Sequence, residues 1–171
     1  MTDPMNAVRH DGGAVTFRTP RAEDGPPVSA LIDECPPLDP NSAYCNLLQC
    51  THFADGCIVA ERDGAIDGWI SGYRLPADPT RYFLWQVAVA ASARGQGLAG
   101  RLLDALLARP AMRGVTHLVT TVTRDNEASW ALFRGFAQRR GTPLRESLCF
   151  DRDIHFGGRQ ASEWQAEIGP F

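Results

Sequence analysis

The sequence predicts an α/β (α+β) domain, in which antiparallel strands are followed by strand and helix units. Three observations support this fold class. Two short apolar segments, 57–62 and 65–73, flank an Asp63-Gly64 turn, which is typical of a β-hairpin. An apolar strand ending at Val89 runs through a glycine-rich turn into a helix with leucines at helical spacing. A further apolar strand, 117–123, again precedes a helix.

The N-terminal part predicts a tail, a strand and two helices. Residues 1–14 are polar and unpatterned, so we expect a flexible tail before a strand at 15–18. Prolines at 26 and 27 fit the first turn of a helix, because that position needs no backbone donor. The prolines of segment 35–40 end this helix, and Asn41 or Ser42 can cap the next one.

The rest of the chain continues the same pattern as one domain. The expected elements are a strand at 82–89, a helix from Leu98 that ends near Pro110, a strand at 117–123, a helix capped by Asp125 or Asn126, and a last core strand at 144–150. We expect the C-terminal extension, about 151–171, to pack on the body of a single domain that spans 15–171.

Composition excludes several classes of protein. The 171 residues include 17 basic and 20 acidic side chains, a net charge of -3, which argues against a nucleic-acid partner. Apolar runs stay below the roughly 18 residues that cross a bilayer, and the N-terminus lacks a signal-peptide core. We therefore expect a cytoplasmic protein with no membrane partner.

The five cysteines predict no metal site. Their number is odd, they form no C-x-x-C pair, and no histidine stands at zinc-finger spacing. Most lie in or beside apolar segments, where a free thiol behaves as a small hydrophobe. A nucleophilic Cys45 or Cys50 would need a lowered pKa and a nearby base, for which His52 is the neighbour in sequence.

The glycine-rich turn predicts an anion site with more than one interpretation. Gly95 and Gly97 lack Cβ atoms, so backbone N–H groups at a helix N-terminus can approach a diphosphate. Gly95, Gly97 and Gly100 match the dinucleotide pattern G-x-G-x-x-G, whereas Arg94, Gly97 and Ala99 match the acyl-coenzyme A pattern [RQ]-x-x-G-x-[GA]. The dinucleotide pattern needs an acidic ribose anchor after the next strand, where this chain has threonines. A purely structural turn is the third interpretation.

The order of elements from about 15 to 150, together with the Arg94 turn, resembles the GCN5-related N-acetyltransferases. Segments CPPLDPNSAYCNLLQC, FLWQVAV, TRDNEASWALF, FDRDIHFGG and EIGPF resemble one family among them, the diaminobutyrate acetyltransferases. The resemblance implies a mixed, mostly antiparallel central sheet flanked by helices, with splayed strands forming an acetyl-CoA cleft. It also implies transfer of an acetyl group from acetyl-CoA to the 4-amino group of L-2,4-diaminobutyrate, without a metal or a covalent enzyme intermediate.

The same resemblance implies a role in ectoine synthesis and osmotic stress. The alternatives left open are an N-acetyltransferase for another small amine, such as ornithine, a polyamine or an aminoglycoside, and a non-catalytic acetyl-CoA sensor. We also expect a homodimer, whose C-terminal extension closes its own active site or that of its partner.

The resemblance assigns the coenzyme residues. The backbone N–H of Val87 is the family's usual donor to the thioester oxygen, and Asn126 is either a coenzyme contact or only a helix cap. The expected coenzyme residues are Val87, Ala88, Val89, Arg94, Gly95, Gln96, Gly97, Leu98, Ala99, Gly100, Asn126, Ser129 and Phe133.

The proton donor and acceptor stay open in the sequence. The family's tyrosine general acid falls on Phe133, so Tyr44, Ser129 or water would protonate the departing thiolate. The acceptor ammonium has a pKa of about 10 and must lose a proton, so the chain needs a base or a water relay. Candidate bases are Glu61, His155, Asp39 and Glu163.

The acceptor itself carries two amines and a carboxylate, so its pocket must offer anionic groups and donors. The expected acceptor residues are Asp39, Tyr44, Trp85, His155 and Glu163, and the expected catalytic residues are Val87, Glu61, Tyr44 and His155. Strand alternation predicts that Trp85 shares a face with Val87 and points away from Leu84 and Gln86.

Overall fold

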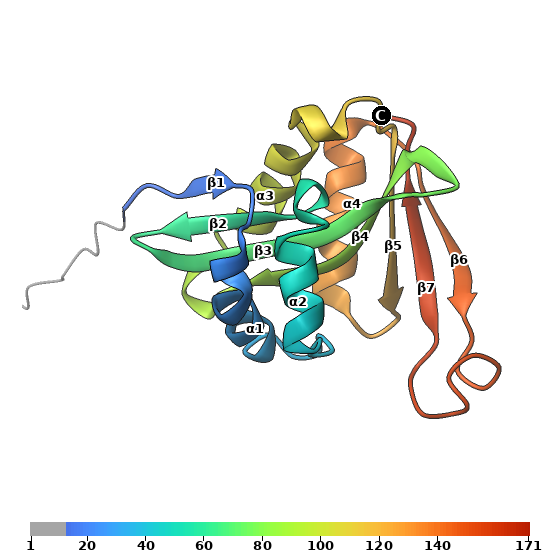
Figure 1. Cartoon of the computed structure of the whole chain (residues 1–171). Coiled ribbons are helices and arrows are strands. Elements are labelled where there is room, and N and C mark those ends of the chain that lie inside the picture. Colours follow the sequence, from blue (N-terminus) through green and yellow to red (C-terminus); the bar gives the residue numbers. More distant parts are fainter. Residues whose placement is uncertain (1–12) are drawn as a thin grey trace, which may run out of the picture.

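A seven-stranded mixed sheet forms the centre of the molecule, with two helices on each face. The computed structural model describes residues 13–171, so most of the expected tail, 1–14, lies outside the described residues. The strand order is β1-β2-β3-β4-β5-β7-β6. Figure 1 shows α1 and α2 on the near face of the sheet and α3 and α4 behind it.

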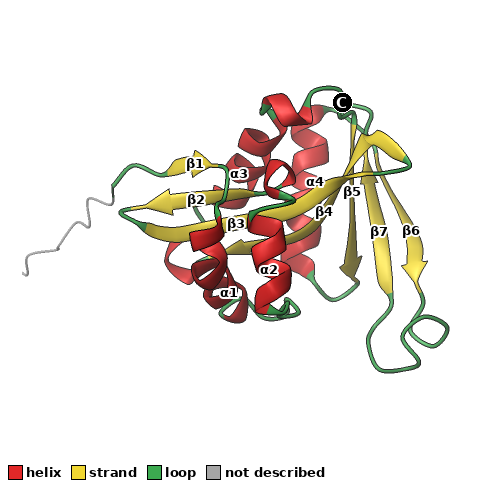
Figure 2. Cartoon of the chain, in the orientation of Figure 1, coloured by secondary structure: helices red, strands yellow, loops and turns green. Residues whose placement is uncertain are grey.

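The helices and strands follow the expected order, with one addition at the C-terminus. The strands are β1 Thr16–Arg18, β2 Ile58–Arg62, β3 Ala65–Leu75, β4 Asp78–Val89, β5 His117–Thr123, β6 Leu144–Phe150 and β7 Glu163–Ile168. The α-helices are α1 Gly25–Asp33, α2 Ala43–Cys50, α3 Leu98–Leu107 and α4 Glu127–Arg140 (Figure 2). Short 3-10 turns lie between helices and strands, as at Ala91–Ala93 before α3. Among the described residues, no helix has the length and apolar character needed to cross a membrane.

Local sequence explains where the helices begin. The side chain of Ser42 accepts a hydrogen bond from Cys45 N and caps α2. Asn126 caps α4 in the same way through Ser129 N, and Gly97, at φ 68°, precedes α3. The proline-rich segment ends α1, and the expected Asp63-Gly64 turn joins β2 to β3 as a hairpin.

β7 is a strand that the sequence pattern missed. It lies between β5 and β6 and pairs antiparallel with both, so the prediction of 144–150 as the last core strand is wrong. The C-terminal extension instead supplies an inner strand, on which Ala166 and Ile168 are completely buried. The sequence pattern did not indicate this strand because it contains Glu163 and Glu167, and carboxylates are rare in buried strands. Residues between β6 and β7 form the protruding loop at the lower right of Figure 1.

Two apolar clusters fill the spaces on either side of the sheet. The larger lies between the sheet and α3 and α4 and includes Leu102, Leu106 and Phe136. The smaller packs α1 against the other face through Val28, Ile32 and Trp69. Together they fix the sheet between its helix layers.

A bulge in β4 changes which side chains share a face. Leu84 and Gln86 pair with consecutive residues of β3, so Trp85 is an extra residue in the strand. The prediction that Leu84 and Gln86 share one face is therefore wrong. Leu84 and Val87 pack in the cluster under α3 and α4, whereas the Gln86 side chain bonds to the loop between α1 and α2.

Substitution of Tyr82 tests the central part of the sheet. This tyrosine is completely buried, and its hydroxyl donates a 2.7 Å hydrogen bond to the Gly56 carbonyl. Tyr82→Phe leaves that carbonyl unsatisfied, so we expect a loss of about 1 to 3 kcal/mol in the free energy of unfolding, measured in urea. Tyr73→Phe, at a partly buried position of the same sheet, should change it by less than about 0.5 kcal/mol. Equal losses in both variants would contradict this assignment.

Candidate active site

The site lies where β4 and β5 stop pairing. Their parallel pairing covers Arg81–Leu84 of β4 and His117–Thr120 of β5 and ends at the Leu84–Thr120 pair. The Thr120 hydroxyl donates a 2.9 Å hydrogen bond to the Leu84 carbonyl and satisfies it at this last pair. Beyond it, β4 continues to Val89 without β5 beside it, which is the splay expected for the coenzyme cleft.

Two neighbouring cavities, each of about 280 Å³, occupy the splay. The polar cavity is lined by Asp39, Trp85, Glu163 and the β5 threonines, and the Arg94 cavity by Cys35, Val89, Arg94 and Ala99. Both cavities share Pro37, Leu38, Val87, Asn126 and Ser129 among their lining residues. Val87 on β4 therefore stands at their junction.

The glycine-rich turn provides an open cradle beside the Arg94 cavity. Gly95 and Gly97 have φ values of +73° and +68°, and a Cβ built on either meets no atom within 4 Å. Their exposed backbone precedes α3, so free N–H groups at the helix N-terminus fit a diphosphate. Arg94 Nε donates to the Val89 carbonyl at 3.0 Å, which ties the turn to the end of β4.

More than half of the expected coenzyme residues line these cavities, and the others do not. The Arg94 cavity is lined by Val87, Val89, Arg94, Ala99, Asn126 and Ser129, and the polar cavity by Phe133. Ala88 and Leu98 are buried in the two apolar clusters and line neither cavity. Gln96 donates to the Ser92 carbonyl, and Gly100 lies near Arg139.

Asn126 is confirmed as a helix cap, and the coenzyme contact stays a prediction. Its Oδ1 accepts the Ser129 N–H at 3.1 Å, so it is a helix cap. It also lines both cavities, as does Ser129. Ser129 therefore lies at the junction of the two cavities, one helical turn before Phe133.

Two carboxylates face the polar cavity from distant parts of the sequence. Asp39 comes from the loop between α1 and α2, and Glu163 begins β7. Burial raises the pKa of the Glu163 carboxyl; the Thr121 hydroxyl opposes this shift, and the charges of Asp39 and Asp125 add to it. The cavity therefore concentrates negative charge and fits a cationic ligand.

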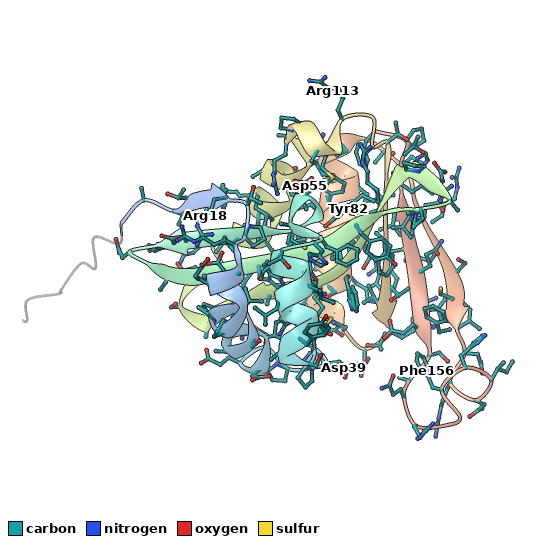
Figure 3. All side chains as sticks on the ribbon, viewed as in Figure 1. Arg18, Asp39, Asp55, Tyr82, Arg113 and Phe156 are labelled. Carbon is teal, nitrogen blue, oxygen red and sulfur yellow. The ribbon has the colours of Figure 1, made fainter. Side chains whose placement is uncertain are left out.

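Three candidates from sequence lie outside both cavities. Glu61 forms a 2.6 Å ion pair with Arg18, which Figure 3 shows well apart from Asp39. His155 Nδ1 accepts the Asp151 N–H at 2.7 Å in the protruding loop. Tyr44 is 71% exposed on α2. Within the single chain, these three side chains therefore lie apart from the cavities that Val87 lines.

The two cysteines of α2 do not form a nucleophilic centre. Burial raises the pKa of Cys50 to about 11 and also raises that of Cys45, so both stay protonated near neutral pH. In residues 13–171, no group of three or more His, Cys, Asp and Glu side chains is placed to hold a metal ion.

The fold and the glycine turn agree with a known family model. Residues 26–136 match the acetyltransferase (GNAT) family. The chain belongs to the GNAT family. Its curated relatives include the L-2,4-diaminobutyric acid acetyltransferases of Halomonas elongata, 47% identical over 96% of this chain and 85% of the relative, and of Methylotuvimicrobium alcaliphilum, 46% identical over 92% and 91%.

A solved structure agrees with most of the GNAT fold of this chain. It is the diaminobutyrate acetyltransferase of Paenibacillus lautus in complex with its substrate L-2,4-diaminobutyric acid and coenzyme A. The two chains superpose with a TM-score of 0.89 at 39% identity, over 93% of this chain and 96% of the other.

Several residues that line this GNAT site were not predicted from the sequence. Gln86, Asn41 and Thr121 line the polar cavity, but no local motif marks them. The Gln86 position depends on the bulge at Trp85, and that of Thr121 depends on where β4 and β5 separate. A polar residue within an otherwise apolar strand, as in LWQVAV, was the available signal for Gln86.

Substitution of Gly97 tests the cradle. Gly97→Val fills the open space beside the backbone N–H groups and forces a β-branched residue to positive φ. We expect the Kd for coenzyme A, measured by calorimetry, to rise at least about tenfold. Gly64→Val is the matched control, because Gly64 has a φ of +81° in the remote β2–β3 turn. Unchanged binding by Gly97→Val, or equal weakening by Gly64→Val, would contradict the cradle.

Proposed function

We propose that this chain transfers the acetyl group of acetyl-CoA to the 4-amino group of L-2,4-diaminobutyrate, giving N4-acetyl-L-2,4-diaminobutyrate. The amine attacks directly while both substrates are bound. The observation that carries the proposal is the meeting of two unlike cavities at Val87, one beside an anion cradle and one lined by carboxylates. Relatives 46% and 47% identical bear this activity in their names.

The Arg94 side of the site fits coenzyme A. The exposed backbone at Gly95 and Gly97 would hold the diphosphate, and the β4 edge beyond Leu84 has backbone groups free for a pantetheine arm. Bound acetyl-CoA supplies an activated acetyl thioester. The Val87 N–H would stabilise the oxygen on which negative charge grows during attack.

The polar cavity fits a small ligand with two ammonium groups. Diaminobutyrate has two ammonium groups, and Asp39 and Glu163 provide two carboxylates facing the same space. We assign Asp39 to the ammonium that does not react and Glu163 to the proton of the reacting amine, directly or through water. Trp85, 46% exposed, forms a wall of this cavity.

Ser129 is the hydroxyl that we assign to the departing thiolate. Phe133 lines the polar cavity but has no proton to donate, and Tyr44 lies outside both cavities. Ser129 lines both. A thiolate with a parent pKa near 8.5 is a tolerable leaving group, so a weak donor or water suffices.

The product supports a role in ectoine synthesis under osmotic stress, as the resemblance implies. The protein would act in the cytoplasm as one domain over residues 15–171.

A homodimer is supported by exposed aromatic side chains, of which Trp85 lines the polar cavity and Phe150 pairs with Glu163, another lining residue. Tyr44, Trp85 and Phe150 are more than 40% exposed. Exposed aromatic side chains are enriched at protein interfaces, and a second copy would bring them next to the site. We expect a dimer by sedimentation velocity at micromolar concentration, and a monomer there would contradict this proposal.

An acetyl-transfer assay tests the function. With acetyl-CoA and L-2,4-diaminobutyrate, the protein should release one free thiol for each acetylated product, detected with a thiol reagent and by mass spectrometry. A panel containing ornithine, a polyamine and an aminoglycoside should give lower kcat/KM values. A higher kcat/KM for one of these amines would show that this amine, and not diaminobutyrate, is the preferred acceptor. Coenzyme binding without turnover of any amine would instead indicate a sensor.

The pH profile tests Glu163. Because burial raises its pKa, kcat/KM should fall on acidification through a pKa above the usual glutamate value of about 4.3, as the carboxylate becomes protonated. Glu163→Gln should lower kcat/KM at pH 8 by about a hundredfold and remove this acid limb. Glu167→Gln is the control, because Glu167 on the same strand pairs with Arg81 instead. An unchanged acid limb in Glu163→Gln would refute the assignment.

A further inference from the structure

The Gln86 side chain joins the central strand to the loop that carries Asp39. Gln86 is 6% exposed, and the bulge at Trp85 turns it toward α1 and α2. Its Nε2 donates to the Asp39 carbonyl at 2.8 Å, and its Oε1 accepts from Asn41 Nδ2 at 2.8 Å. Both ends of one buried amide thus bind residues two apart in the same loop.

The loop, residues 34–42, depends on such a side-chain anchor. Three of its residues are prolines, which have no N–H to donate. Within it, the Leu38 N–H bonds to the Cys35 carbonyl, so that bond shapes the loop without attaching it to the sheet. Gln86 therefore provides the attachment at the Asp39 end, while Arg94 contacts the Cys35 sulfur at the other end.

A buried amide network extends this attachment to both near-face helices. Asn41 Nδ2 also lies 3.2 Å from Asn46 Oδ1, and Asn46 Nδ2 donates to Ser29 Oγ at 2.7 Å. Asn46 is on α2 and Ser29 on α1, and Asn46 is 1% exposed. Buried networks of this kind hold one geometry, because breaking any member leaves a buried polar group unsatisfied.

Gln86 also precedes Val87, which stands at the junction of the two cavities. The Gln86 side chain therefore contacts the loop that carries Asp39, and the next residue of the same strand, Val87, lines the coenzyme side of the site. We propose that Gln86 is a positioning residue that holds Asp39 over the polar cavity and sets its place relative to Val87. The consequence for catalysis rests on the proposed function, whereas the attachment of the loop does not.

Gln86→Met tests the proposal, because methionine keeps the length of the side chain and removes both hydrogen bonds. In hydrogen exchange of the free protein, amides in peptides covering residues 38–46 should exchange at least about fivefold faster than in the wild type. Peptides covering the turn 94–100 should stay within about twofold. Unchanged exchange at 38–46 would overturn the attachment, whether or not the protein acetylates diaminobutyrate.

Kinetics test the catalytic consequence. Gln86→Met should raise the KM for diaminobutyrate about tenfold and leave the KM for acetyl-CoA within about twofold, because only the acceptor side is displaced. Equal changes in both KM values, or no change for diaminobutyrate, would overturn the positioning role. A wild type with no turnover of diaminobutyrate would overturn the proposed function, and the exchange measurement would then decide the loop attachment alone.

Two further variants separate positioning from general damage. Asn41→Ala should raise the KM for diaminobutyrate as Gln86→Met does, and the double variant should be less impaired than the product of both effects. Gln138→Met, at an exposed position of α4, should match the wild type in exchange and in both KM values. Independent, multiplicative effects of the first two variants would contradict a shared role.

Discussion

The site depends on the short pairing between β4 and β5. The pairing covers four residues of each strand. At its last pair, the Thr120 hydroxyl donates a hydrogen bond to the Leu84 carbonyl. Past this point β5 continues beside β7, whereas β4 continues beside β3. A longer pairing would fill both cavities and occupy the β4 edge with another strand. The separation of two strands therefore creates the coenzyme and acceptor sides together.

Each side of this opening is held by a different kind of interaction. Apolar packing of α3 and α4 fixes the helix starts at the glycine turn and at Asn126. On the near face, a buried amide network around Gln86 fixes the loop with Asp39. Together with Glu163 from β7, that loop makes a cavity in which burial, and after it repulsion from the charges of Asp39 and Asp125, raises the pKa of Glu163. A cationic acceptor relieves that repulsion, so the electrostatics favour an amine over a neutral ligand.

The features decided by neighbouring residues could be predicted from sequence. The Arg94 turn, the Asn126 cap and the 63–64 hairpin each depend on local geometry, and the structure has all three. Long-range pairing decided the rest. β7 is an inner strand because β5 and β6 flank it, and the bulge at Trp85 arises in register with β3. Glu61 was a candidate base because of its residue type alone, but the sequence does not reveal that Arg18 pairs with it.

The most direct test of this account is a crystal structure with coenzyme A and L-2,4-diaminobutyrate bound together. We expect the diphosphate on the backbone of the Gly95–Gly97 turn, the coenzyme sulfur and the 4-amino group on either side of Val87, and the acceptor between Asp39 and Glu163. Coenzyme bound away from the splay, or an acceptor outside the polar cavity, would contradict the claim that the separation of β4 from β5 builds the active site.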